Sequence, residues 1–316
     1  MKNYLIISTG GTISCTNSVK GLLPTISAEQ ILRLCNTDSS EYDITVLSQT
    51  DSTDIDTDLL NKLVQLTGSS VDKYKGILIL HGTDTLEATA SLLSAYFDHC
   101  DIPVAITGSM LPAESQNSDA PINVRTAVSL LKSGLNGVYV VIGGKVIKGS
   151  KAVKVFTDRV CAFYSADETY ISLASPQKCE HTPLTQQGFV PDFKKGLEPR
   201  IFLLRFSPVM GLDIFDYIEQ MDYRGCIISG YGAGGVPIRF YDKIKTLSEK
   251  GIIFAMTSQC AFGKVDFSLY ATGSLAFKLG IIPLPQMSDM AAVMRLSAAL
   301  GSTYNYNDIY SFMTKL

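Results

Sequence analysis

The feature that most constrains the fold is an alternation between short apolar runs and longer segments of helical period. The runs are rich in β-branched residues and have the length of buried strands. Strands are expected at 4–8, 43–47, 76–80, 102–106 and 137–142. Helices are expected near 27–36, 57–67, 85–98 and 121–133. Apolar strands joined by helical crossovers favour a mostly parallel sheet with helices on both faces, and ligands of such sheets bind beyond the carboxyl ends of the strands.

A chain of 316 residues is long enough for about two domains. The alternation lapses around residues 176–199, where the sequence is polar and contains several prolines. We therefore expect a larger N-terminal α/β domain at 1–178, a linker at 179–199 and a smaller C-terminal α/β domain at 200–316. In the smaller domain, strands are expected at 200–206, 225–229 and 251–256, and helices near 211–221, 237–250 and 288–300.

Charge and residue content argue against several classes of protein. The net charge is −3 and the lysines and arginines are scattered, so no nucleic-acid partner is expected. Seven cysteines without a CxxC pair and three dispersed histidines argue against a disulfide scaffold and against a metal site. No apolar run reaches the roughly 18 residues that span a bilayer, and a strand pattern begins at once in place of a signal segment. We expect a cytoplasmic protein with no membrane partner.

Three expected strand ends carry unusual polar residues. "TGGTIS" (9–14) follows the first strand, "DSTDI" (51–55) follows the second, and "HGTDTLEATA" (81–90) follows the third. The carboxyl ends of parallel strands meet at one edge of a sheet, so these segments are expected to share a rim. The side chains that the rim would collect are Thr9, Thr12, Ser52, Thr53, Thr83, Asp84 and Thr85.

Such a rim could hold a nucleophile. A threonine hydroxyl is weakly nucleophilic at neutral pH, so it requires a base and also donors for the charge that develops on the substrate. The glycines beside it allow sharp turns that present backbone N–H groups to a ligand. The residues alone leave other interpretations open: Thr12 as a turn residue, Asp84 as a helix N-cap and His81 as a structural residue.

The combination of motifs resembles the bacterial L-asparaginase family. "TGGTI" after the first strand and "HGTDTLEATA" after the third are the two signature motifs of that family. The resemblance continues through "DSTDI" (51–55), "TGSMLP" and "NSDAPINVRTAV" (107–128) and "KGSKAVKVFTDRVCAFYS" (148–165). "TSQCAFGKVDFSLYATG" (257–273) is similar to the cytoplasmic branch, so the resemblance covers nearly the whole chain.

The resemblance implies an amidohydrolase that converts L-asparagine to L-aspartate and ammonia through an acyl-enzyme, with glutamine as a slower substrate. It implies that Thr12 is the nucleophile and that Thr83, Asp84 and Lys154 form a second catalytic group. At Lys154, desolvation would favour a neutral amine able to act as a base, whereas Asp84 would keep the amine charged. No metal and no organic cofactor are implied.

Substrate-binding residues are implied in the same way. Ser52 and Thr53 would hold the α-carboxylate of the substrate, and backbone N–H groups around Gly11 and Gly82 would face the oxyanion. Asp84 would also face the α-ammonium group.

Further implications concern assembly and one departure from the family. The resemblance implies a homodimer or homotetramer in which a neighbouring C-terminal domain completes each site, with Asp266 as a candidate contributor. The family usually has a tyrosine on the loop after TGGTI, in a position where this chain has Leu22.

Three other functions remain open from the sequence. The G-x-G-x-x-G at 230–235, with Glu249 downstream, is typical of a dinucleotide-binding module. A tRNA-dependent amidotransferase subunit resembles asparaginase, but it usually carries an extra domain before TGGTI. Leu22 also makes a catalytically silent amino-acid-binding protein conceivable.

Overall fold

The first strand, β1 (Tyr4–Gly10), is buried along its whole length and lies between two parallel neighbours, β4 (Tyr42–Thr50) and β5 (Ile77–Leu80). The computed structural model describes residues 2–19, 21–173, 189–269 and 271–315, which belong to two compact units, Met1–Leu184 and Thr185–Leu316. A strand that is apolar on both faces is stable only where both faces are covered, so β1 occupies the interior of the sheet.

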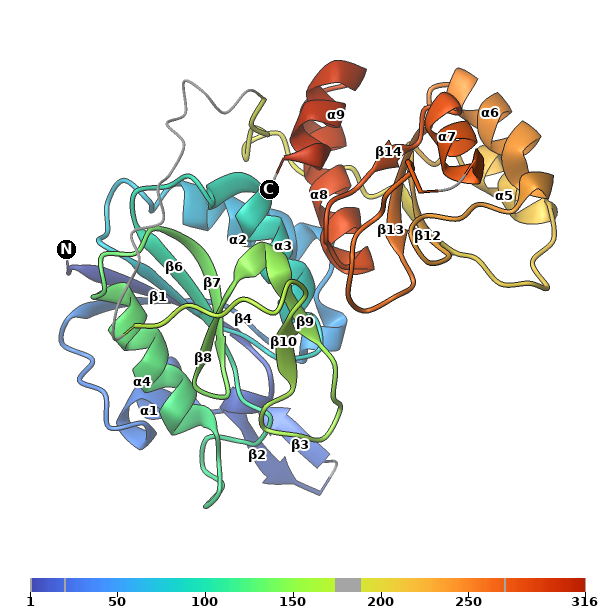
Figure 1. The fold of residues 1–316 in the computed structure, drawn as a ribbon. Coiled ribbons are helices and arrows are strands. Elements are labelled where there is room, and N and C mark those ends of the chain that lie inside the picture. Colours follow the sequence, from blue (N-terminus) through green and yellow to red (C-terminus); the bar gives the residue numbers. More distant parts are fainter. Residues whose placement is uncertain (1, 20, 174–188, 270, 316) are drawn as a thin grey trace. The chain divides into compact units, whose positions relative to one another are not determined.

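The sheet of the first unit has the order β4-β1-β5-β6-β7-β8 (Figure 1). Its other strands are β6 (Pro103–Thr107), β7 (Gly137–Ile142) and β8 (Lys145–Lys148). The first five strands in this order run parallel, and β8 is antiparallel to β7. The turn into β8 consists of Gly143 and Gly144, whose φ values of 58° and 71° suit a two-residue hairpin.

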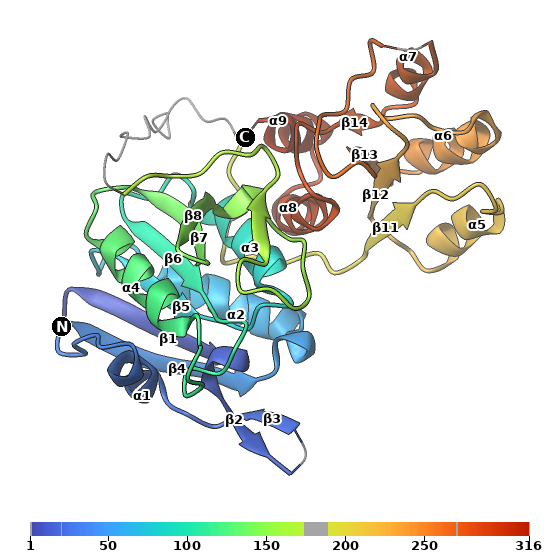
Figure 2. The ribbon, with the colours of Figure 1, turned by 60° about the horizontal axis from the view of Figure 1, so that its bottom comes forward.

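Helices cover both faces of this sheet (Figure 2). They are α1 (Ala28–Leu34), α2 (Thr57–Gly68), α3 (Leu86–Phe97) and α4 (Ala120–Leu131). Helices α1 and α4 pack on the face that presents Ile6, Leu78 and Tyr139, and α2 and α3 lie on the other. The prediction of a larger, mostly parallel sheet with helices on both faces is therefore confirmed.

Several short elements extend the strand ends and were not anticipated. A hairpin of β2 (Cys15–Ser18) and β3 (Gly21–Pro24) follows the turn η1 (Thr12–Ser14). The turn η2 (Ser52–Asp54) follows β4. The turn η3 (Gly149–Lys151) leads into a second hairpin, β9 (Ala152–Lys154) with β10 (Phe163–Ser165).

The second unit is a smaller parallel sheet of order β11-β12-β13-β14. Its strands are β11 (Ile201–Arg205), β12 (Gly225–Gly230), β13 (Ile253–Ser258) and β14 (Ile282–Pro283). Its helices are α5 (Asp213–Gln220), α6 (Tyr241–Glu249), α7 (Ala271–Lys278), α8 (Asp289–Ser302) and α9 (Tyr306–Thr314). The smaller α/β domain is thereby confirmed as a fold, although β14, α7 and α9 were not anticipated.

One predicted helix needs correction. The helix expected at 237–250 begins only at Tyr241, because Pro237 is extended and is followed by the tighter turn η5 (Ile238–Phe240). Part of the linker expected at 179–199 lies outside the described residues, and the described stretch 189–199 contains no helix or strand. In the part of the chain that the structure describes, no helix has the length and hydropathy needed to cross a bilayer.

Candidate active site

Two glycines bring the carboxyl ends of β1, β4 and β5 close together. A methyl group built on Gly11 would lie 2.1 Å from the Cα of Gly82, and one built on Gly82 would lie 2.6 Å from the Cβ and Oγ of Ser52. Gly11 also has φ 77° and ψ −179°, a conformation that is almost restricted to glycine. Glycine at both positions therefore lets TGGTI and HGTDT meet backbone to backbone and lets HGTDT pack closely on the side chain of Ser52 in DSTDI.

Thr12 opens the turn η1 and is partly exposed. The turn is closed by Ser14, whose N–H and hydroxyl donate to the carbonyl of Gly11 at 2.9 and 2.8 Å. Thr12 is therefore not needed to close its own turn. Thr9, by contrast, is buried and its hydroxyl donates to the carbonyl of Leu80 at 3.2 Å, which makes it a link between neighbouring strands.

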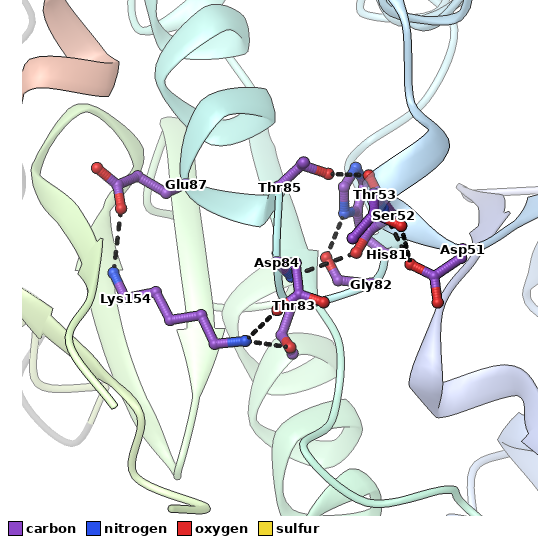
Figure 3. A network of polar contacts seen from close by, with 10 residues as sticks. All are labelled: Asp51, Ser52, Thr53, His81, Gly82, Thr83, Asp84, Thr85, Glu87 and Lys154. Carbon is purple, nitrogen blue, oxygen red and sulfur yellow. Dashed lines mark hydrogen bonds and ion pairs between the residues drawn. The ribbon is translucent and has the colours of Figure 1, made fainter. Parts of the chain in front are cut away.

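Lys154 joins the segment after β5 to the end of β9 (Figure 3). Its Nζ donates to Thr83 Oγ1 at 2.9 Å and to Asp84 Oδ1 at 2.6 Å. The lysine side chain is 15% exposed and the aspartate side chain is 54% exposed, so the pair reaches from the packed rim to solvent. Asp84 is not the N-cap of α3, because that position belongs to Thr85. Since Lys154 donates to Thr83 Oγ1, the Thr83 hydroxyl proton must point to a different acceptor.

Ser52 connects the second and third strand ends. It is buried, its Oγ accepts the N–H of Asp84 at 3.3 Å, and its carbonyl accepts the hydroxyl of Thr85 at 2.8 Å. The Ser52 hydroxyl can still donate its own proton, as a group that binds a carboxylate must. Thr53 is exposed, and both its N–H and its hydroxyl donate to Asp51 Oδ1 at 2.9 Å.

His81 supports the third strand end from within the core. Its ring is fully buried between the carbonyl of Gly82, 2.7 Å from Nδ1, and the hydroxyl of Thr89, 2.9 Å from Nε2. Burial lowers the pKa of His81 to about 4, so the ring is neutral at pH 7. With the Gly82 carbonyl facing Nδ1, the proton belongs on that nitrogen, and the ring fixes the backbone before Thr83.

A fourth strand end, after β6, is held by a carboxylate whose role the sequence reading did not identify. Asp119 is buried and accepts the N–H groups of Met110 and Leu111 at 3.0 and 3.1 Å. Asn123 donates to Asp119 and to the carbonyl of Gly108. A methyl group on Gly108 would lie 2.3 Å from the carbonyl oxygen of His81, so this loop packs directly on the third strand end.

Two other residues singled out from the sequence lie on hairpins or loops. Leu22 is on β3, opposite Asn17, and the residue is 46% exposed. Asp266 accepts the N–H and the hydroxyl of Ser268 through Oδ1, and these hydrogen bonds lower its pKa.

The glycine-rich segment at 230–235 does not have the geometry of a dinucleotide-binding turn. It closes on itself, because the N–H groups of Gly234 and Gly235 both donate to the carbonyl of Tyr231. The helix α6 begins only at Tyr241, so no helix N-terminus follows the glycines directly. Within the described residues, no three His, Cys, Asp or Glu side chains gather closely enough to bind a metal ion together.

Comparison with known proteins places this arrangement among related sequences. The family model described as asparaginase, N-terminal, matches residues 3–183, and the one described as glutaminase/asparaginase C-terminal domain matches residues 200–313. An L-asparaginase from Thermococcus kodakarensis is 32% identical and aligns with 98% of this chain and 96% of that protein. A protein from Metallosphaera sedula that is named as a subunit of glutamyl-tRNA(Gln) amidotransferase is 29% identical and aligns with 98% of this chain and 74% of that protein.

Solved structures resemble the fold over the whole chain. The thermostable L-asparaginase from Thermococcus kodakarensis matches with a TM-score of 0.87 at 31% identity, covering 100% of this chain and 98% of that one. L-asparaginase I from Vibrio cholerae matches with a TM-score of 0.83 at 22% identity, covering 100% and 98% of the two chains, a likeness of fold alone.

Proposed function

The chain belongs to the asparaginase family, and from that premise we propose that it hydrolyses L-asparagine to L-aspartate and ammonia. The observation that carries the proposal is the contact of Lys154 Nζ with both Thr83 Oγ1 and Asp84 Oδ1, beside the strand end that presents Thr12. A nucleophile and a proton-relay group on adjacent strand ends suit amide hydrolysis.

In the proposed reaction, the Thr12 hydroxyl oxygen attacks the side-chain amide carbon while its proton passes to the proposed base, the Lys154 amine beside Thr83. The carbonyl oxygen becomes an oxyanion that faces backbone N–H groups around Gly11 and Gly82, and collapse expels ammonia after the nitrogen is protonated. An ester between Thr12 and the aspartyl group remains, and water hydrolyses it: the water oxygen becomes part of the aspartate carboxylate and one water proton restores the Thr12 hydroxyl. The proposed role of Lys154 with Thr83 is to deliver these protons, and Asp84 holds Lys154 in place.

The same rim supports the proposed recognition of the substrate backbone. Ser52 accepts the N–H of Asp84, which leaves its hydroxyl able to donate to an α-carboxylate. The partly exposed carboxylate of Asp84 is suited to an α-ammonium group. Thr53 lies beside Ser52 as a second proposed contact. We further propose that asparagine is preferred to glutamine and that no metal or organic cofactor takes part.

A second candidate is the glutamine-hydrolysing subunit of a tRNA-dependent amidotransferase. It is supported by the 29% identity to the Metallosphaera sedula protein named as a subunit of glutamyl-tRNA(Gln) amidotransferase, which matches 98% of this chain. Such a subunit would release ammonia from glutamine in response to a partner subunit and glutamyl-tRNA. Asparagine turnover by the chain alone therefore separates the two candidates.

The deciding experiment measures ammonia release from asparagine and glutamine by wild type, Thr12→Val and Thr16→Val. Loss of a nucleophile is expected to lower kcat by about 1000-fold or more in Thr12→Val. Thr16→Val is the control, because Thr16 lies in the hairpin after Thr12 and its hydroxyl pairs with Thr25. A wild-type rate of ammonia release in Thr12→Val would refute the assignment of Thr12 as the nucleophile. Glutamine turnover that needs glutamyl-tRNA and a partner subunit would favour the amidotransferase.

Location and assembly complete the proposal. All six cysteines among the described residues are free thiols, which supports a reducing compartment such as the cytoplasm. We propose a homodimer or homotetramer, with Asp266 as the candidate residue contributed to a neighbouring site. Light scattering of the purified protein measures the number of subunits.

A further inference from the structure

Glu87 contacts the backbone of Lys154, at the opposite end of the residue from the ammonium group. The Glu87 Oε2 atom accepts the N–H of Lys154 at 3.1 Å (Figure 3). Glu87 is the second residue of α3 and follows Asp84 by three positions. The five-residue stretch 83–87 therefore holds Lys154 at both ends, by its backbone through Glu87 and by its Nζ through Thr83 and Asp84.

The N–H of Lys154 needs an acceptor because of where it lies in its hairpin. Strand β9 pairs with β10 in an antiparallel ladder that matches Lys154 with Phe163. Beyond that pair, the N–H of Val155 donates to Ala162. Successive N–H groups of a strand point to opposite sides, so the N–H of Lys154 points away from β10. The carboxylate of Glu87 satisfies this group, which is otherwise on a strand edge.

A second contact shows that α3 serves as a platform for the chain leading to Lys154. A methyl group on Gly149 would lie 2.4 Å from Ser94 Oγ and 3.0 Å from the carbonyl oxygen of Ala90, both on α3. The segment 149–154 is therefore packed against α3 at its start and hydrogen-bonded to α3 at its end. Glu87 is also well placed for an acidic residue, because a negative charge is favoured in the first turn of a helix.

We propose that Glu87 is a positioning residue for the reaction, which fixes the backbone of Lys154 so that its Nζ reaches Thr83 and Asp84. A lysine side chain has four rotatable bonds and loses much entropy when its end is held. A fixed backbone reduces the number of conformations that Lys154 can adopt, which keeps Nζ within hydrogen-bonding distance of Thr83. This inference rests on the proposed function, in which Lys154 transfers protons.

The test compares Glu87→Ala with Glu87→Gln in asparagine hydrolysis. Glu87→Ala removes the acceptor, and displacement of Lys154 is expected to lower kcat by about 10- to 100-fold with KM changed by no more than about twofold. Glu87→Gln retains an acceptor oxygen and is expected to stay within about threefold of wild-type kcat. Glu29→Ala is the matched control, because Glu29 is the second residue of α1 and is exposed.

A second measurement does not depend on activity. Hydrogen exchange of the Lys154 amide, followed by NMR, is expected to be faster in Glu87→Ala than in wild type and near wild type in Glu87→Gln. If Glu87→Ala does not fold, Glu87→Asp takes its place, since the shorter side chain draws the acceptor back by about one bond length.

The outcomes distinguish this inference from the proposed function. If wild type is active, Lys154→Met is inactive and the kcat of Glu87→Ala equals that of Glu29→Ala, the positioning role of Glu87 is refuted while the proposed function stands. Equal loss of kcat in Glu87→Ala and Glu87→Gln would also refute it, because charge and not the hydrogen bond would then matter. If wild type does not hydrolyse asparagine, the proposed function fails, and the exchange of the Lys154 amide still decides whether Glu87 holds that backbone.

Discussion

Replacing Gly11 with alanine should separate the two strand ends that carry Thr12 and Thr83. A methyl group at Gly11 would lie 2.1 Å from the Cα and 2.3 Å from the N of Gly82, and these backbone atoms cannot rotate away. Ordinary contact begins at 3.4 Å. The two segments must therefore move apart by roughly 1 Å, a shift that can lower the rate of a catalysed step by about 100-fold.

Two separate costs in stability add at this position. Holding a residue other than glycine at φ 77° and ψ −179° costs about 1 to 3 kcal/mol. The steric overlap with Gly82 adds about 1 to 3 kcal/mol, as is typical of overpacking. Gly134→Ala is the matched control, because Gly134 also has φ +77° and its methyl group would meet no atom within 4 Å.

Urea-induced unfolding gives the free energy of unfolding of each variant. Ammonia release from asparagine gives kcat, measured under conditions in which Gly11→Ala and Gly134→Ala are both folded. Gly134→Ala is expected to be less stable than wild type but to keep its kcat, because it carries only the backbone strain. Gly11→Ala is expected to lose more stability and about 100-fold in kcat. Equal losses in the two variants would refute the argument, since the close approach to Gly82 would then contribute nothing.

Two further predictions concern buried titratable groups. Burial lowers the pKa of His81 from 6.5 to about 4. Between these pH values the unfolded chain binds a proton at His81 more readily than the folded chain does. The free energy of unfolding should therefore fall by about 3 kcal/mol as the pH drops from 6.5 to 4. In urea unfolding, His81→Asn should lose less over this pH range, and an unchanged pH dependence would contradict the assignment. Asp119→Ala leaves the N–H groups of Met110 and Leu111 without their acceptor and should lower the free energy of unfolding by about 3 kcal/mol. Asp119→Asn keeps an acceptor oxygen and should recover part of that loss, so equal losses in the two variants would argue against the hydrogen bonds.

Local periodicity was sufficient to predict the principal strands and most of the helices. A buried parallel strand such as β1 is a continuous apolar run, and helices such as α2 have a capping residue and a repeat of about 3.6, all of which are local properties. The hairpins β2–β3 and β9–β10 were missed because strands of three or four residues leave little periodic signal.

The sequence also located the polar segments at strand ends, but local patterns alone left the roles of their residues open, and the grouping of Thr83, Asp84 and Lys154 came from the family resemblance. Asp84 was compatible with a helix cap, and only the fold brings it within 2.6 Å of Lys154, a residue 70 positions away. Glu87 looks like an ordinary acidic residue in a first helical turn until β9 is seen beside α3.

The sequence by itself therefore determined the α/β class and the identity of the rim segments, because both follow from neighbouring residues. The tertiary structure decided that β1 lies between β4 and β5, and that Gly11 packs on Gly82 and Gly82 on Ser52. Strand order and backbone contact depend on how distant segments cross and pack, and no local pattern specifies them.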